Sequence, residues 1–312
     1  MWLIILFATI ILLITNNQIV ISGASYGLML WYKSIVPLLL PFMLISGIVE
    51  KKIIKQKNKQ YLAIPSILFL GLFCGYPIGA KATSTFVKEG TINLSTGNLL
   101  LPICNNVSPM FFLGYILSST LNNSISPFKA YAIIFLPYII ILLSEHLIIK
   151  LHNLSHDNSS KEKTFSVTKQ SMPNSSADNS HTNCPSRKSK QEYNQSISEQ
   201  SINQITMVGL YIMLCSVISE FILSINYIPN ITKIVSLGIT EITRGVTYIS
   251  ESNLLFQNAK TALILACTSF GGISSIMQTT KVIQGSGLSL LHYTVIKLIC
   301  AICTYYLCLL VI

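Results

Sequence analysis

Long apolar runs constrain this chain more than any other feature. Several of them, with their flanks, reach the roughly 20 residues that a helix needs to cross about 30 Å of hydrocarbon. The runs lack the alternation of barrel strands, and open sheet edges cannot face lipid. Only 10% of the residues are charged, against about 25% in soluble proteins. The sequence therefore predicts an all-α, polytopic helical membrane protein, with apolar runs at 2–14, 34–49, 63–73, 130–143, 262–267 and 288–312.

The excess of positive charge is concentrated in one place. A formal net charge of +10 at pH 7 would suggest nucleic acid in a soluble protein. Here, however, lysines follow directly after an apolar run, an arrangement that marks the cytoplasmic side and attracts anionic lipid headgroups. We therefore predict the lipid bilayer and anionic headgroups as partners, and no nucleic acid. The cluster at 51–59 consists of Lys51, Lys52, Lys55, Lys57 and Lys59.

Metal, cofactor and enzyme chemistry have no pattern in this sequence. Seven of the eight cysteines lie in or beside apolar runs, where thiols behave as small hydrophobic groups. Cys300 and Cys303 form a CxxC pair, but no second pair and no histidine follow at zinc spacing. The P-loop, GxSxG and HExxH motifs are absent from the sequence. We expect no metal, no cofactor and no enzymatic activity.

One polar stretch divides the chain into two membrane parts. Residues 152–204 are rich in Ser, Asn, Gln and Lys, and such a composition cannot bury enough apolar surface to offset the entropy lost on ordering. We expect a flexible linker there, between a first membrane repeat at 1–151 and a second at 205–312. The Lys and Arg residues of the linker favour the cytoplasm. We place the linker and the N-terminus in the cytoplasm, and the protein in the cell membrane.

The two membrane parts resemble each other. Residues 27–36 align with residues 209–218 at a constant offset, and residues 75–90 can be laid on residues 270–285. The first helix ends in the lysine cluster, whereas its counterpart ends in a stretch without Lys or Arg. The two repeats are then expected to run in opposite directions across the membrane, as in many secondary transporters.

The number of apolar stretches predicts a re-entrant hairpin. Three stretches, 61–80, 99–121 and 130–150, lie between the lysine cluster and the linker. Three full crossings would put these two basic segments on opposite sides of the membrane. If 61–80, which contains Gly75 and Pro77, enters and leaves on one side, both basic segments are cytoplasmic. We therefore predict that each repeat holds a broken or re-entrant segment, tolerated because protein or a water-filled cavity satisfies its backbone.

Four polar groupings interrupt the apolar sequence and form the candidate solute-binding site. Each has a structural alternative: a kinked helix, interhelical hydrogen bonds, close packing of small residues, or an ion pair between Glu241 and Arg244. Paired interruptions in two halves are typical of transporter binding sites, which favours the site interpretation. The candidates are Gly75, Tyr76, Gly79 and Lys81; Asn105, Asn106 and Ser108; Glu241; and Ser269, Gly271, Gly272, Ser274 and Gln278.

Four motif strings lie at these groupings: Gly75-Tyr76-Pro77-x-Gly79-Ala80-Lys81, Asn105-x-x-Ser108-Pro109, Glu241-x-Thr243-x-Gly245 and Ser269-Phe270-Gly271-Gly272. With these strings the chain resembles the YlbJ-type sporulation integral membrane proteins of the nucleoside-recognition (Gate) domain superfamily. The resemblance covers nearly the whole chain except the linker, and the first and last strings are its specific part. It implies a cell-membrane protein of spore formation, related to nucleoside transporters.

These observations lead to one expected function and one rival. We expect a transporter-like permease for a small polar, nucleoside-like solute in spore formation, with Asn105, Asn106 and Gln278 donating or accepting hydrogen bonds at the site. The rival is a non-transporting scaffold that organises other sporulation membrane proteins, and a homo-oligomer fits either function. A scaffold would tolerate polar substitutions in the breaks, whereas a permease would not.

Overall fold

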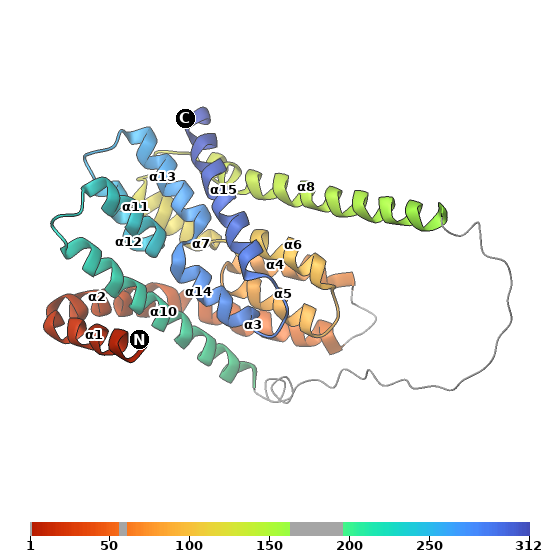
Figure 1. Ribbon diagram of the computed structural model, residues 1–312, viewed down its shortest axis with the longest axis horizontal. Coiled ribbons are helices and arrows are strands. Elements are labelled where there is room, and N and C mark those ends of the chain that lie inside the picture. The colour runs from red at the N-terminus through yellow and green to blue at the C-terminus, as the bar shows by residue number, and fades with distance from the viewer. Residues whose placement is uncertain (1, 56–60, 163–195) are drawn as a thin grey trace.

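The computed structural model describes residues 2–55, 61–162 and 196–312, and within these ranges it contains helices and no strand. Several helices are long and apolar enough to cross a bilayer, which confirms the predicted all-α, polytopic membrane class (Figure 1). A further candidate joins Trp2–Thr15 to Asn17–Ile35, which are bent by 88°. The five other candidates are Leu94–Thr120, Pro127–Glu145, Ile197–Ser224, Gln257–Ile283 and Leu290–Val311.

The helices fall into two groups, before and after the long grey segment of Figure 1, residues 163–195. Those before it are α1 (Trp2–Thr15), α2 (Asn17–Leu30), the π-helical η1 (Trp31–Ile35), α3 (Val36–Lys55), α4 (Ala63–Cys74), α5 (Ile78–Lys88), α6 (Leu94–Cys104), α7 (Pro109–Phe111), the π-helical η3 (Phe112–Thr120) and α8 (Pro127–Glu162). Those after it are α10 (Ile197–Ser224), α11 (Asn230–Thr240), α12 (Ile242–Glu251), α13 (Gln257–Phe270), α14 (Gly272–Ile283) and α15 (Leu290–Val311).

The order of these elements is the same in both halves. A long helix (α2–η1–α3 or α10) is followed by a hairpin (α4–α5 or α11–α12), then a broken span (α6–α7–η3 or α13–α14), then a closing helix (α8 or α15). This order pairs the break at Gly75 with Glu241, and the break at 105–108 with Gly271. The two strings that the sequence aligns therefore occupy different places in this order: 75–90 covers the turn and second arm of the α4–α5 hairpin, and 270–285 covers the break and second part of the α13–α14 span.

The long helices of the two halves pack antiparallel to each other. Going along α2–η1–α3 from its N-terminal to its C-terminal end, the contacts move along α10 from its C-terminal to its N-terminal end. Positions 27 and 31 are the aligned counterparts of 209 and 213, so each helix presents the same two positions to the other. The glycine contacts are Gly27 with Met213, Gly209 with Trp31, and Gly47 with Ile197.

Both hairpins close through two facing glycines, and a cysteine of the following broken span lies against them. A methyl group on one glycine would lie 3.0 Å from its partner's Cα in the first hairpin and 2.4 Å in the second. Only hydrogen fits such positions, so glycine lets the two arms of each hairpin approach closely. The sets are Gly71, Gly79 and Cys104 in the first half, and Gly238, Gly245 and Cys267 in the second.

Helix extends into the stretch that composition predicts to be a linker. Helix α8 continues to Glu162, and α10 begins at Ile197. The hydroxyl of Ser196 accepts a hydrogen bond from the backbone N–H of Glu199 at 3.2 Å, so a Ser-x-x-Glu capping pattern starts this helix. The centre of the expected linker, 163–195, and the end of the lysine cluster, 56–60, lie outside the described residues.

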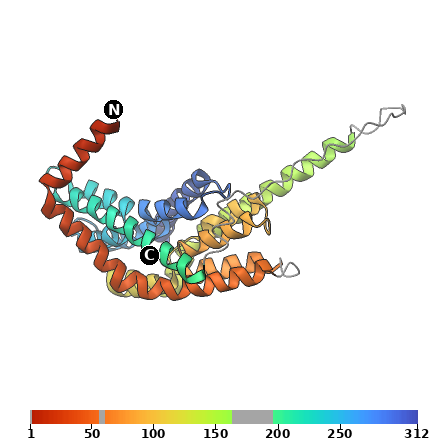
Figure 2. The ribbon, with the colours of Figure 1, turned by 90° about the horizontal axis from the view of Figure 1, so that it is seen from below.

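At the N-terminus, α1 stands apart from the other helices (Figure 2). Its side chains are apolar except for Thr9 and Thr15, and none of its described residues is buried. In a membrane, lipid or another protein surface would cover such a helix.

Candidate functional site

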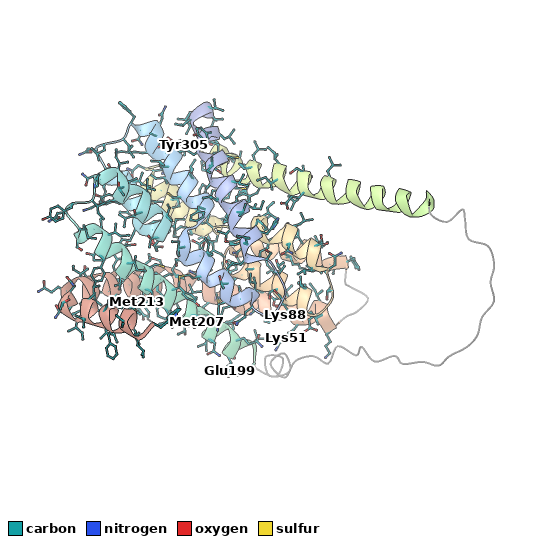
Figure 3. The ribbon with its side chains drawn as sticks, viewed as in Figure 1. Lys51, Lys88, Glu199, Met207, Met213 and Tyr305 are labelled. Atoms are coloured by element: carbon teal, nitrogen blue, oxygen red, sulfur yellow. The ribbon has the colours of Figure 1, made fainter. Side chains whose placement is uncertain are left out.

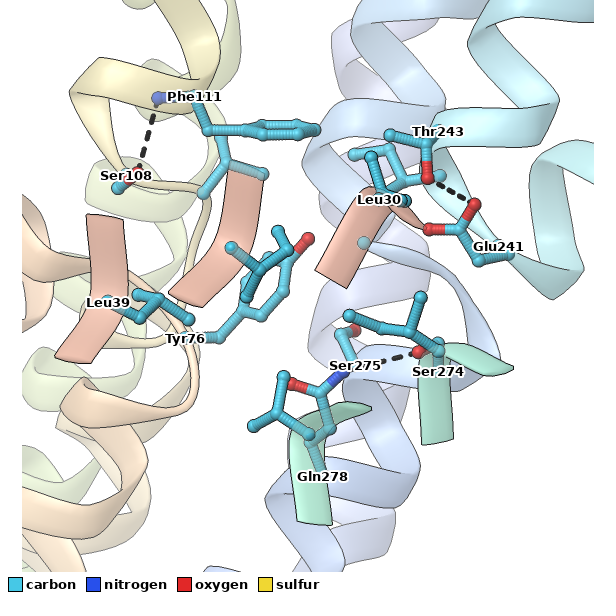
Figure 4. Close-up of a pocket in the computed structure, with 16 residues that line it drawn as sticks. Leu30, Leu39, Tyr76, Ser108, Phe111, Glu241, Thr243, Ser274, Ser275 and Gln278 are labelled. Atoms are coloured by element: carbon cyan, nitrogen blue, oxygen red, sulfur yellow. Dashed lines mark hydrogen bonds between the residues drawn. The ribbon is translucent and has the colours of Figure 1, made fainter. Parts of the chain in front are cut away.

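Four helix breaks meet at one pocket (Figure 4). They are the two hairpin turns, α4–α5 and α11–α12, and the two interruptions of the broken spans, α6–α7 and α13–α14. The space between them amounts to about 580 Å³, counting the open space at its mouth. Residues from the breaks that line it are Tyr76, Val107, Ser108, Phe111, Glu241, Ile242, Thr243, Gly271, Ser274, Ser275 and Gln278, and the remaining wall is Leu30, Ile35, Leu39, Val208 and Ile212.

In the first half, the two breaks touch directly. The backbone N–H of Tyr76 donates to the carbonyl of Asn106 at 2.8 Å. Gly75 has a φ of 74°, and a methyl group there would lie 2.5 Å from the backbone nitrogen of Ser108. Glycine is needed at Gly75 both for the left-handed backbone and for this close approach.

In the second half, the two breaks also lie close to each other. Gly272 has a φ of 77°, and a methyl group there would meet the Thr240 carbonyl at 3.3 Å and the Glu241 Cα at 3.4 Å. A methyl group on the neighbouring Gly271 would lie 3.9 Å from the ring of Tyr76 in the first half, and both residues line the pocket. The predicted meeting of the interruptions from both halves is therefore present in the structure.

Glu241 is the acidic group of the pocket. It is 3% exposed and occupies the N-cap of α12, where its Oε2 accepts from the Thr243 hydroxyl and, at 2.9 Å, from the Arg244 backbone N–H. Carboxylates are favoured there because helix N-termini carry partial positive charge. The other oxygen, Oε1, points into the pocket (Figure 4).

The ion pair between Glu241 and Arg244, an alternative suggested by the sequence, is not formed. The Arg244 guanidinium lies 2.7 Å from Glu220 Oε2 on α10 and 3.7 Å from the centre of the Tyr26 ring. Because Glu241 caps its helix, its carboxylate turns back to the backbone amides and away from the Arg244 side chain. Glu241 has no ion pair within the described residues.

Gln278 adds a second open acceptor to the pocket, that is, a side-chain oxygen, like Oε1 of Glu241, with no hydrogen bond to a described residue. Its Nε2 donates to the Ser274 hydroxyl at 3.2 Å, while its buried Oε1 has no hydrogen-bond partner among the described residues. A buried acceptor without a partner costs about 1–3 kcal/mol. Together with the Oε1 of Glu241, it makes the polar wall of the pocket suited to a solute that donates hydrogen bonds.

The other candidates from the sequence lie outside the pocket lining. Lys81 of α5 is half-buried and interacts electrostatically with the buried Glu50 of α3. The backbone carbonyl of Ser269 accepts from the Tyr138 hydroxyl of α8 at 2.7 Å. The candidates that do not line the pocket are Gly75, Gly79, Lys81, Asn105, Asn106, Ser269 and Gly272.

Asn105 and Asn106 belong to a buried polar network behind the pocket. Asn105 Nδ2 donates to the Thr279 hydroxyl at 2.7 Å and to the Tyr293 hydroxyl at 2.9 Å. Asn106 Oδ1 accepts from Lys297 Nζ at 2.7 Å. These contacts are the interhelical hydrogen bonds offered as the alternative for this grouping, so they replace direct solute contact for these two side chains.

The sequence reasoning missed Lys297, Tyr293 and Tyr138. Lys297 stands alone in the apolar run of α15 and is 1% exposed. A lysine inside a transmembrane run is itself a signal, because ionisable residues there are costly and functional.

The histidine, cysteine and acidic side chains of the described residues form no group of three that could hold a metal.

Comparison with known proteins gives one similarity. A stretch of this chain is 26% identical over 113 residues to the Sporulation integral membrane protein YlbJ of Bacillus subtilis (strain 168), and it covers 32% of this chain and 28% of that protein. No protein-family model and no solved structure matches the chain. The chain spans well under a third of the relative's length in this match. With the polytopic helical fold, the similarity supports a YlbJ-like membrane family for this multi-pass membrane protein.

Proposed function

We propose that this protein is a permease for a small polar, nucleoside-like solute that donates hydrogen bonds. The convergence of four helix breaks on one pocket is the observation that carries the proposal. Broken helices at a repeat interface are how secondary transporters form their solute sites. Two open acceptors, Glu241 Oε1 and Gln278 Oε1, select for donors on the solute, such as hydroxyl or amino groups.

The apolar side of the pocket limits what else the solute can be. The rings of Tyr76 and Phe111 and the aliphatic side chains of α3 and α10 line it. Apolar and aromatic walls with a few placed polar groups are typical of small-molecule sites. A flat ring with a hydroxylated or aminated end fits this combination, which is why a nucleoside-like solute is preferred over a simple sugar or an ion.

We propose further that the two halves are inverted repeats, with the N-terminus, the 51–59 loop and the linker in the cytoplasm. The repeated element order and the antiparallel packing of α2–η1–α3 on α10 support opposite directions. Because Gly47 lies against Ile197, the end of α3 and the start of α10 share one side. Figure 3 places Lys51, Lys88 and Glu199 toward this end of the molecule, and the lysines there favour the cytoplasm.

A place in spore formation, in the cell membrane, is the last part of the proposal. It is supported by the similarity to a protein named for sporulation and by the resemblance of the break motifs to the nucleoside-recognition superfamily. A permease in this setting would move its solute across a membrane of the developing spore. A scaffold for other sporulation proteins would not need the open acceptors of the pocket.

The proposal is tested by uptake into liposomes that contain the purified protein. We expect uptake of at least one compound from a panel of nucleosides, free bases, amino sugars and amino acids, against protein-free liposomes as control. A protein that takes up and binds none of them, while its gene remains necessary for sporulation in the host, would favour the scaffold.

The proposed topology predicts which loops a membrane-impermeant thiol reagent reaches. In a cysteine-free background, Lys55→Cys and Ser196→Cys should resist the reagent in intact cells and react after permeabilisation. Tyr227→Cys, which lies in an exposed loop beyond the other end of α10, should react in intact cells. Labelling of Lys55→Cys or Ser196→Cys from outside would reject the inverted arrangement.

A further inference from the structure

The side-chain amino group of Lys297 lies buried beside the pocket without an acidic partner among the described residues. Lys297 Nζ contacts Asn106 Oδ1 at 2.7 Å and the Asn105 carbonyl at 3.3 Å, and it lies 5.2 Å from the centre of the Tyr138 ring. No ion pair joins Lys297 to a carboxylate of the described residues. A charge buried at this position would be costly unless other groups compensate it, and the groups near Nζ are two neutral oxygens and one aromatic face.

These oxygens belong to the end of a half-helix. Asn105 is the C-cap of α6, and Asn106 follows it in the unwound segment before α7. The last carbonyls of a helix lack intrahelical partners and carry partial negative charge. Carbonyls from unwound segments and half-helix C-terminal ends are the groups with which transporters hold a coupling cation. In this protein, the side chain of Lys297 fills such a position.

The position of Lys297 also connects it to the pocket. The side-chain oxygen of Asn106 accepts a hydrogen bond from Lys297 Nζ, and its backbone carbonyl accepts one from the Tyr76 N–H. Lys297 therefore holds in place the residue that positions Tyr76. On the other side, Tyr138 faces the ammonium and donates its hydroxyl hydrogen to Ser269 in the second half. The group thus lies between the breaks of both broken spans.

We propose that the Lys297 ammonium is a built-in cation that holds the α6–α7 break in its solute-binding conformation, in place of a soluble coupling ion. Lys297 acts as a positioning residue, since it does not line the pocket. A consequence that rests on the proposed permease function is that solute binding needs neither sodium nor another soluble cation. The effect on the break itself does not depend on any solute.

Hydrogen–deuterium exchange of the peptide covering 101–112 tests the proposal without a solute. Lys297→Ala removes three methylene groups and the ammonium, so n-propylammonium has the shape and charge to refill the space. We expect exchange at 105–108 to accelerate about tenfold to hundredfold in Lys297→Ala, as for a lost hydrogen bond to a charged group. Propylammonium should restore slow exchange, whereas 1-propanol, a neutral molecule of similar shape, should not.

Two further variants keep the test decisive. Lys297→Gln retains a donor near the same length without the charge, and it should also accelerate exchange even if Lys297→Ala fails to fold. Lys233→Ala removes another buried lysine, whose Nζ donates to the Leu223 carbonyl at 2.9 Å, and it should leave exchange at 105–108 unchanged. Wild-type exchange in Lys297→Gln, or equal restoration by 1-propanol, would overturn the proposal.

A binding measurement tests the consequence for the solute. Wild-type protein should bind its solute equally well in sodium chloride and in choline chloride, and a requirement for sodium would overturn the built-in cation. Absence of binding to any solute in both salts would count against the permease, while the exchange experiment would still decide the role of Lys297.

Discussion

Gly79→Ala is expected to destabilise the fold more than alanine at any other described glycine. A Cβ at this position would lie 1.9 Å from the Cys104 carbonyl oxygen and 3.0 Å from the Gly71 Cα, both of them backbone atoms. Relief requires the hairpin α4–α5 to move away from α6. Overpacking of this kind costs about 3 kcal/mol or more, a large part of the 5–15 kcal/mol that stabilises a typical protein.

The measurement is the recovery of monodisperse protein in detergent together with its thermal midpoint. We expect Gly79→Ala to lower the midpoint by about 5 °C and to reduce the recovered yield. Gly114→Ala is the matched control, because a methyl group there has no neighbour within 4 Å, and its midpoint should not fall below that of wild type. A Gly79→Ala variant as stable as Gly114→Ala would contradict the close packing of the first hairpin on the broken span.

Glu241→Gln is expected to produce the largest loss of solute binding. The substitution keeps the size of the side chain and an oxygen that can cap α12, but it removes the charge from the oxygen that points into the pocket. A hydrogen bond to a charged group contributes about 1.5–3 kcal/mol, so the dissociation constant should rise about tenfold to hundredfold. Equilibrium binding to purified protein, with the solute found by the uptake panel, measures the change.

The control for Glu241→Gln comes from the same helix. Glu251 is the exposed last residue of α12, far from the N-cap, and Glu251→Gln should bind the solute like wild type. The thermal midpoints of both variants identify any loss that arises from weaker capping alone. Unchanged affinity in Glu241→Gln would mean that this carboxylate is only a helix cap.

The positions of the breaks could be predicted from sequence because the residues that cause them are local. Gly75 and Gly271 directly follow α4 and α13, with positive φ values of 74° and 85°. Glycine adopts such a backbone easily and so favours a helix end at these positions, whereas Pro41, Pro102 and Pro137 lie inside helices. The all-α membrane class was equally accessible, because it depends only on the length of the apolar runs.

The partners of each break depend on tertiary packing and could not be read from sequence. The spacing of Glu241 and Arg244 predicts an ion pair on one helix face, but Glu220 on α10 takes the guanidinium. Asn106 was expected to face a solute, and the ammonium of Lys297 occupies its side-chain oxygen instead. In both cases the residue that forms the contact is distant in the sequence, so no local sequence pattern predicts the contact.

The correspondence between the halves also needed the fold. Residues 75–90 and 270–285 share glycines and threonines, yet the first belong to a hairpin and the second to a broken span. A facing glycine pair is instead found in each hairpin, Gly71 with Gly79 in α4–α5 and Gly238 with Gly245 in α11–α12. The sequence alone does not identify these glycines as pairs, because their significance depends on the hairpins that bring them together.

The central claim, that residues from both halves bind one solute in one pocket, is tested most directly by thiol protection. Ser108→Cys in the first half and Ser274→Cys in the second line the pocket from opposite sides, and each is made in a cysteine-free background. Labelling by N-ethylmaleimide is followed as the solute concentration rises, with exposed Gln284→Cys of the loop after α14 as control. We predict that the solute protects both pocket cysteines with the same half-maximal concentration and leaves the control unprotected. Protection of one pocket cysteine without the other, or of neither by a solute that binds, would contradict the shared pocket.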